Sequence, residues 1–77
     1  MELAMVKACV LIKTNPNVTD KVLANIKKMS GVRKAYAAIG RWDIVVFVDA
    51  STEETRTIAV SINSIDGVRS TETLPQA

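Results

Sequence analysis

Apolar residues recur every three or four positions in two segments of the chain, and this spacing predicts two amphipathic helices. The first helix is expected over Val18–Met29 and the second over about Thr52–Ile65. Their apolar stripes are Val18, Val22, Leu23, Ile26 and Met29 in the first, and Ile58, Ala59, Ile62 and Ile65 in the second. Asn17 is the expected N-cap of the first helix, and Ser51 with Glu54 forms a capping box before the second.

Four other segments are rich in β-branched residues or alternate between apolar and polar positions, which predicts strands. They cover Leu3–Lys13, Val32–Ile39, Trp42–Asp49 and Val68–Leu74. Gly40-Arg41 is then expected to be a two-residue type II′ hairpin loop, in which glycine takes the first central position. The resulting order, β-α-β-β-α-β, predicts an α+β fold of the ferredoxin-like kind with a four-stranded antiparallel sheet.

The sequence also repeats once, since Gly31-Val32-Arg33 and Gly67-Val68-Arg69 each follow a predicted helix. The two copies of strand, helix and strand agree with the predicted order of elements. Right-handed crossovers are expected to place the first and third strands side by side at the centre, as a parallel pair. Lys7 and Asp43 would then lie near the starts of neighbouring strands, where they could form an ion pair of small energetic value.

The two faces of the predicted sheet differ in polarity. One face is apolar and is assigned to the helices: Ala4, Val6, Ala8, Val10, Ile12, Trp42, Ile44, Val46 and Val48. The other is apolar in the middle and charged at its ends: Met5, Lys7, Cys9, Leu11, Lys13, Tyr36, Asp43, Val45, Phe47 and Asp49. An apolar centre with a polar rim is the anatomy of an interface. We therefore expect a homodimer packed sheet to sheet through Leu11, Tyr36, Val45 and Phe47.

Composition narrows the possible functions. The chain has 77 residues, which predicts one domain over residues 1–77 whose marginal stability favours oligomerisation. It has no histidine and a single cysteine, Cys9, so a CxxC metal or redox site is excluded. A formal net charge of +2 is too small to indicate nucleic-acid binding. The N-terminal segment is a poor signal peptide, and no apolar run is long enough to span a membrane, so a cytoplasmic protein is expected.

The segment Gly40-Arg41-Trp42-Asp43 falls between the second and third strands, and Gly67-Val68 and Thr71-Glu72-Thr73 accompany the last strand. In this topology the three segments resemble the effector-binding domain of the Lrp/AsnC family, the RAM module, over nearly the whole chain. Two positions depart from the family pattern, because Ile39 stands where a threonine is usual and Asp66 replaces a proline. The family's helix-turn-helix DNA-binding domain is absent, so the resemblance implies a stand-alone module without direct DNA binding.

The resemblance also implies a ligand and partners. Modules of this family form dimers that assemble into octamers or decamers, and they bind free amino acids between dimers near this hairpin. Asp43 is then expected to accept hydrogen bonds from the α-ammonium group, and the loop N–H groups or Arg41 to bind the carboxylate. Trp42 is expected either in the core or in the wall of the site. The full set of expected ligand-binding residues is Gly40, Arg41, Trp42, Asp43, Thr71 and Thr73.

No catalytic residue, metal or cofactor is expected beyond the amino-acid effector. A partnership with full-length Lrp/AsnC regulators by mixed assembly and a purely sensory role are both open. Two other classes share the predicted topology: small dimeric ferredoxin-like enzymes of the monooxygenase or isomerase type, and ACT-like regulatory domains. The enzymes usually need a histidine or another poised base, and here only Lys7, Tyr36 and Asp43 are at hand.

Overall fold

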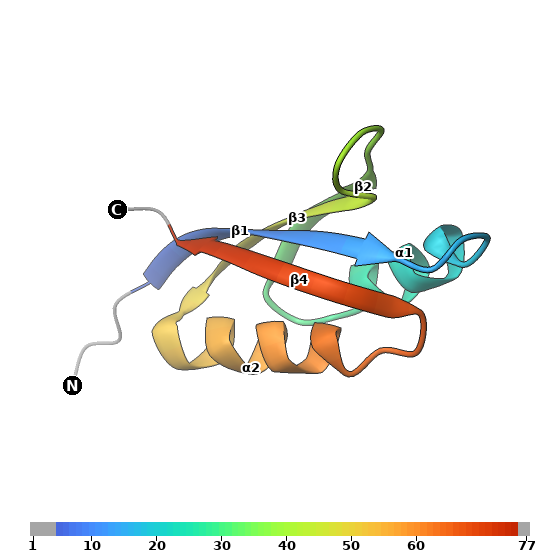
Figure 1. Ribbon diagram of the computed structural model, residues 1–77. Coiled ribbons are helices and arrows are strands. Elements are labelled where there is room, and N and C mark those ends of the chain that lie inside the picture. Colours follow the sequence, from blue (N-terminus) through green and yellow to red (C-terminus); the bar gives the residue numbers. More distant parts are fainter. Residues whose placement is uncertain (1–4, 76–77) are drawn as a thin grey trace.

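The computed structural model describes residues 5–75, in which one sheet is covered on one side by two helices (Figure 1). The strands are β1 (Met5–Thr14), β2 (Val32–Ala37), β3 (Ile44–Ser51) and β4 (Val68–Pro75), and the helices are α1 (Thr19–Lys27) and α2 (Thr52–Asn63). The four strands lie in the order β2-β3-β1-β4, and every neighbouring pair is antiparallel. The predicted ferredoxin-like βαββαβ fold is confirmed; the predicted start of the first strand, Leu3 and Ala4, lies outside the described residues.

The expectation of a parallel pair at the centre of the sheet is wrong. The crossover through α1 makes β2 run parallel to β1, but it leaves a space for one strand between them. The chain then turns back through the hairpin, and β3 fills that space. A strand that follows a hairpin runs antiparallel to the strand before it, so β3 is antiparallel to both of its neighbours. This register places Lys7 opposite Asp49, at the other end of the sheet from Asp43. The predicted Lys7–Asp43 pair therefore does not form.

The two helices begin differently. At α2 the predicted Ser51 cap is confirmed, because the Glu54 N–H donates to the Ser51 hydroxyl at 3.1 Å. The Glu54 side chain accepts from that same hydroxyl at 3.1 Å, and not from the Ser51 backbone N–H of a full capping box. At α1 the predicted Asn17 cap is wrong, because the N-cap position is Val18 and no side chain caps the helix. Asn17 instead takes a left-handed conformation, with φ of 69°, in the turn before α1. Neither helix among residues 5–75 is long and apolar enough to cross a membrane.

An aliphatic core fills the space between the helices and the sheet. The residues with no exposed surface come from four elements: Val10, Ile12, Val22, Ile26, Ile44, Val46 and Ile62. Those from β1 and β3 occupy the face that the alternation of these strands assigned to the helices. The turn into β4 passes close to α1, since a Cβ at Gly67, where φ is +102°, would lie 2.9 Å from a methyl group of Val18. This close approach explains the need for glycine at that end of the core.

Candidate functional site

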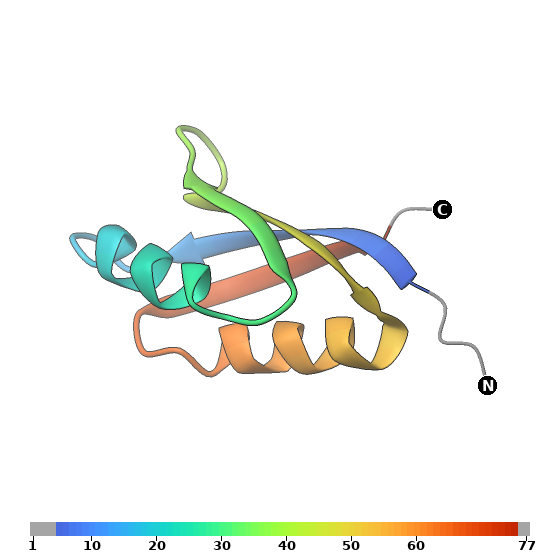
Figure 2. The same ribbon diagram turned by 180° about the vertical axis from the view of Figure 1, so that it is seen from behind.

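The opposite face of the sheet is not covered by any helix among residues 5–75 (Figures 1 and 2). Tyr36 and Phe47 are each 41% exposed on it, and their ring centroids are 6.1 Å apart. Val45 lies between Tyr36 and Leu11 in register, so the four residues predicted for a dimer interface form one continuous apolar group. We call the uncovered side the open face.

The hairpin between β2 and β3 stands at one end of the open face. Ala38 N–H donates to the Asp43 carbonyl at 2.8 Å, so the loop holds the four residues Ile39 to Trp42 and the predicted two-residue type II′ loop is wrong. Gly40 has φ of +129° within it, a conformation that side chains rarely permit. Both overall views show the loop projecting from the sheet on the side away from α2 (Figures 1 and 2). The loop therefore stands clear of the sheet, and Ile39 in it is fully exposed.

Asp43 anchors this loop to the rest of the fold. Its Oδ2 accepts a hydrogen bond from the backbone N–H of Thr14 at 2.8 Å and lies 3.4 Å from the hydroxyl of Thr14, which in turn lies 2.7 Å from that of Thr19. The Asp43 N–H donates to the Ile12 carbonyl at 2.8 Å. The carboxylate therefore joins the hairpin to the end of β1 and the start of α1. Among residues 5–75 the bonds to this carboxylate all use Oδ2, and none uses Oδ1.

The other residues predicted for the ligand site are not all near Asp43. Arg41 is exposed in the loop, where its carbonyl accepts a hydrogen bond from Lys13 Nζ at 3.2 Å. Trp42 is half-buried beside Asp43 and does not belong to the core of the described residues. Thr71 and Thr73 are half-buried on β4, opposite Ile12 and Val10, so they share the helix-covered side of the sheet. One chain therefore brings together Gly40 to Asp43, and the two threonines lie across β1 from them.

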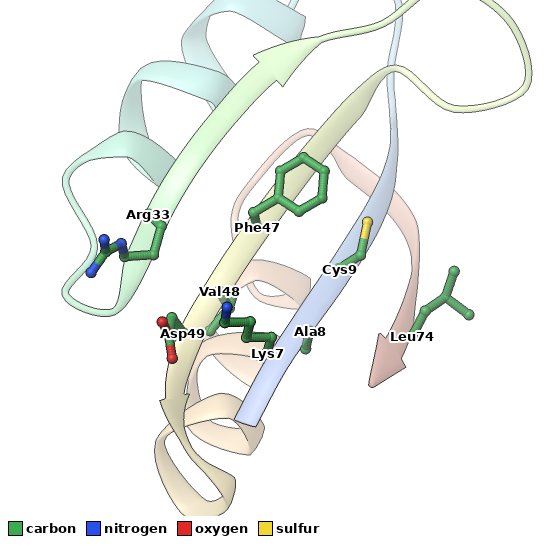
Figure 3. Close-up of a pocket in the computed structure, with 8 residues that line it drawn as sticks. All are labelled: Lys7, Ala8, Cys9, Arg33, Phe47, Val48, Asp49 and Leu74. Atoms are coloured by element: carbon green, nitrogen blue, oxygen red, sulfur yellow. The ribbon is translucent and has the colours of Figure 1, made fainter. Parts of the chain in front are cut away.

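The structure also shows a hollow that the sequence interpretation missed. It occupies about 370 Å³ on the open face, near the start of β1 and the end of β3 (Figure 3). Its lining consists of Lys7, Ala8, Cys9, Arg33, Phe47, Val48, Asp49 and Leu74. One sequence signal pointed to it, the pair Arg33-Lys34, which breaks the alternation of polar and apolar residues in β2. Within residues 5–75 no cluster of three or more potential metal-ligating side chains occurs.

Comparisons with known proteins agree with this architecture. The family model described as "Lrp/AsnC ligand binding domain" matches residues 7–75. The protein TTHA0845 from Thermus thermophilus is 30% identical with a TM-score of 0.89, and the match covers 94% of this chain and 92% of that one.

More distant structures share the fold. FFRP-DM1 is 23% identical with a TM-score of 0.83, and the match covers 94% of this chain and 99% of that one. The AsnC protein of E. coli is 24% identical with a TM-score of 0.80, where 92% of this chain matches 50% of that one. No curated protein matches the sequence significantly. The family match spans nearly the whole chain, and we conclude that the protein belongs to the Lrp/AsnC family through the ligand-binding domain of that family.

Proposed function

We propose that this protein is a regulatory module that binds a free amino acid at the hairpin and assembles with copies of itself, rather than an enzyme. The observation that carries the proposal is the position of Asp43. Its carboxylate is fixed by the Thr14 N–H at 2.8 Å, beside a glycine-containing loop that projects from the fold. A carboxylate held in place before the ligand arrives loses little conformational entropy on binding.

Each end of an amino acid finds a suitable group at this hairpin. The α-ammonium group would donate a charge-assisted hydrogen bond to Asp43 Oδ1. The α-carboxylate would accept hydrogen bonds from loop N–H groups near Gly40 and from the Arg41 guanidinium. The half-buried ring of Trp42 would form part of the wall. A neighbour of similar fold, the regulator NMB0573 of Neisseria meningitidis, was solved as a complex with L-Met; it is 14% identical, with a TM-score of 0.78.

Assembly is proposed through two surfaces. The open face would pack on the open face of a second copy, since Leu11, Tyr36, Val45 and Phe47 form one apolar group there. The projecting hairpin would meet another dimer in an octamer or decamer, so that each amino acid lies between dimers. Thr71 and Thr73 of one chain would then complete the hairpin site of another. Mixed assembly with full-length regulators of the family would use the same surfaces.

We also propose that the protein does not bind DNA directly. Within residues 5–75 β2 and β3 separate α1 from α2, so the two helices do not form a helix-turn-helix. The ten basic and eight acidic residues nearly balance, so the electrostatic attraction that drives non-specific DNA binding is weak. Any effect on transcription would therefore pass through a partner that carries the DNA-binding part.

Calorimetry on Asp43→Asn tests the amino-acid site. Asparagine keeps an oxygen that can accept the hydrogen bond from the Thr14 N–H, so the hairpin should stay in place while the negative charge at position 43 is lost. We expect the amino acid to bind at least about 1.5 kcal/mol more weakly, the lower end for a hydrogen bond to a charged group, with the oligomer intact. Asp49→Asn is the matched control, because it removes a carboxylate at the other end of the sheet. Equal binding by Asp43→Asn and the wild type would exclude Asp43 from the site.

A further inference from the structure

The hollow on the open face has the size of a small-molecule site and is separate from the hairpin. Its volume of about 370 Å³ lies at the lower end of the range of roughly 300–1,000 Å³ that is typical of ligand pockets. It is centred on the row in which Phe47, Cys9 and Leu74 lie opposite one another in three neighbouring strands. The amino-acid site at the hairpin uses none of these residues.

A β-bulge places Arg33 at the rim of this hollow. Val32 pairs with Val48, and Lys34 pairs with Phe47, so Arg33 is an extra residue with no partner of its own in β3. Strict alternation would turn either Arg33 or Lys34 towards the helices, but both are exposed. Figure 3 shows the Arg33 side chain at the outer edge of β2, with its guanidinium directed away from Phe47 and Cys9, so this group would turn inward to meet a ligand in the hollow. Bulges often re-aim a side chain next to a functional site, and here the side chain is that of an arginine.

The charges and apolar groups of the hollow are separated. Lys7 and Asp49 lie opposite each other in register, and Arg33 adds a second cation at the same end (Figure 3). Burial raises the pKa of the Cys9 thiol, so that this group is neutral at pH 7. The lining therefore carries a net charge of +1, from Lys7, Arg33 and Asp49. Phe47 and Leu74, which are 41% and 46% exposed, supply an apolar wall beside these charges.

We propose that the hollow binds a small monocarboxylate with an apolar body. The carboxylate would form a bidentate pair with the Arg33 guanidinium, whose planar fork of N–H donors matches that geometry. The apolar body would lie against Phe47 and Leu74. Lys7 and Arg33 outnumber Asp49 in the lining, so its net positive charge favours an anion, and a zwitterionic amino acid of the same carbon skeleton binds less well. A second copy packed on the open face would exclude water and strengthen the ion pair.

The test is a titration with 4-methylpentanoate, followed by the amide resonances of the whole chain. Leucine, which has the same carbon skeleton plus an ammonium group, is titrated in parallel. Lys34→Gln is the matched control for Arg33→Gln, because both residues are exposed on β2 and only Arg33 lines the hollow. We expect 4-methylpentanoate to shift the resonances of Cys9, Phe47 and Leu74. Arg33→Gln should raise its dissociation constant at least about tenfold, and Lys34→Gln should leave it within about twofold.

Four results would overturn this assignment. The first is an equal loss of affinity for 4-methylpentanoate in Arg33→Gln and Lys34→Gln, which would indicate general charge attraction. The second is a set of shifts confined to the hairpin, and the third is the absence of any shift at millimolar concentration. The fourth is that leucine shifts the resonances of the hollow at least as strongly as 4-methylpentanoate does. Failure of the hairpin proposal would show differently, as amino-acid binding that is indifferent to Asp43→Asn. The two sites are therefore tested by different probes and by different substitutions.

Discussion

The two faces of the sheet use the same strands for different purposes. On the side of the helices, Val10, Ile12, Ile44 and Val46 have no exposed surface, and the side chains of this core are all aliphatic. On the open face the neighbouring positions hold aromatic, sulfur-containing and charged side chains, and Phe47 and Tyr36 keep 41% of their surface exposed. One face thus holds the chain together, and the other is the face that we propose binds a second molecule.

The largest expected effect is on the free energy of unfolding. Two adjacent residues of β1 point to opposite faces of the sheet, so substituting each in turn compares the faces. Ile12 is fully buried against the helices, while Leu11 lies half-buried on the open face. Ile12→Ala should lower the free energy of unfolding by about 2–5 kcal/mol, from lost transfer energy and the cavity left behind. Leu11→Ala should cost less than half as much in urea unfolding at the same protein concentration. Equal losses would mean that the open face contributes to the core as strongly as the covered one.

The next effect is on assembly. Phe47→Asp should dissociate the protein to a mass near the 8.4 kDa of one chain, because packing a second copy on this apolar group would remove the new carboxylate from water. Val60→Asp is the matched control, since Val60 is an apolar residue on α2 that is 62% exposed. That variant should keep the mass of the wild type in light scattering. A wild-type protein that is a well-folded monomer at micromolar concentration would contradict the proposed interface.

The covered face was predictable from the sequence because its signals are local. Alternation in β1 and β3 and the stripes of both helices depend only on residue type and spacing, and they identified most of the core. Two details of the covered side were missed. Thr55 is buried on α2 although its residue type is usually exposed, and Asn17 serves the turn before α1 rather than the cap. Tertiary packing overrides the usual exposure of threonine at Thr55, whereas Asn17 follows a second local preference of asparagine, for the left-handed conformation in turns.

The candidate site was harder to predict from the sequence, because it is built by contacts between residues that are far apart along the chain. The sequence predicted an acid beside a glycine turn, but the Thr14 N–H that holds Asp43 comes from a residue 29 positions away. The orientation of the central strands was missed because β3 enters between β1 and β2, an insertion that the repeat conceals. The bulge at Arg33 was missed for a related reason, since two successive polar residues are also typical of an exposed edge. Strand pairing was thus the missing information in all three cases.

We propose above all that the hairpin at one end of the open face responds to free amino acids. The most direct measurement is a screen of the twenty amino acids by thermal shift, with the mass followed by light scattering in the same samples. We expect at least one amino acid at millimolar concentration to raise the melting temperature and change the mass distribution, because a site shared between dimers links binding to assembly. A flat response to all twenty, in both melting temperature and mass, would contradict it.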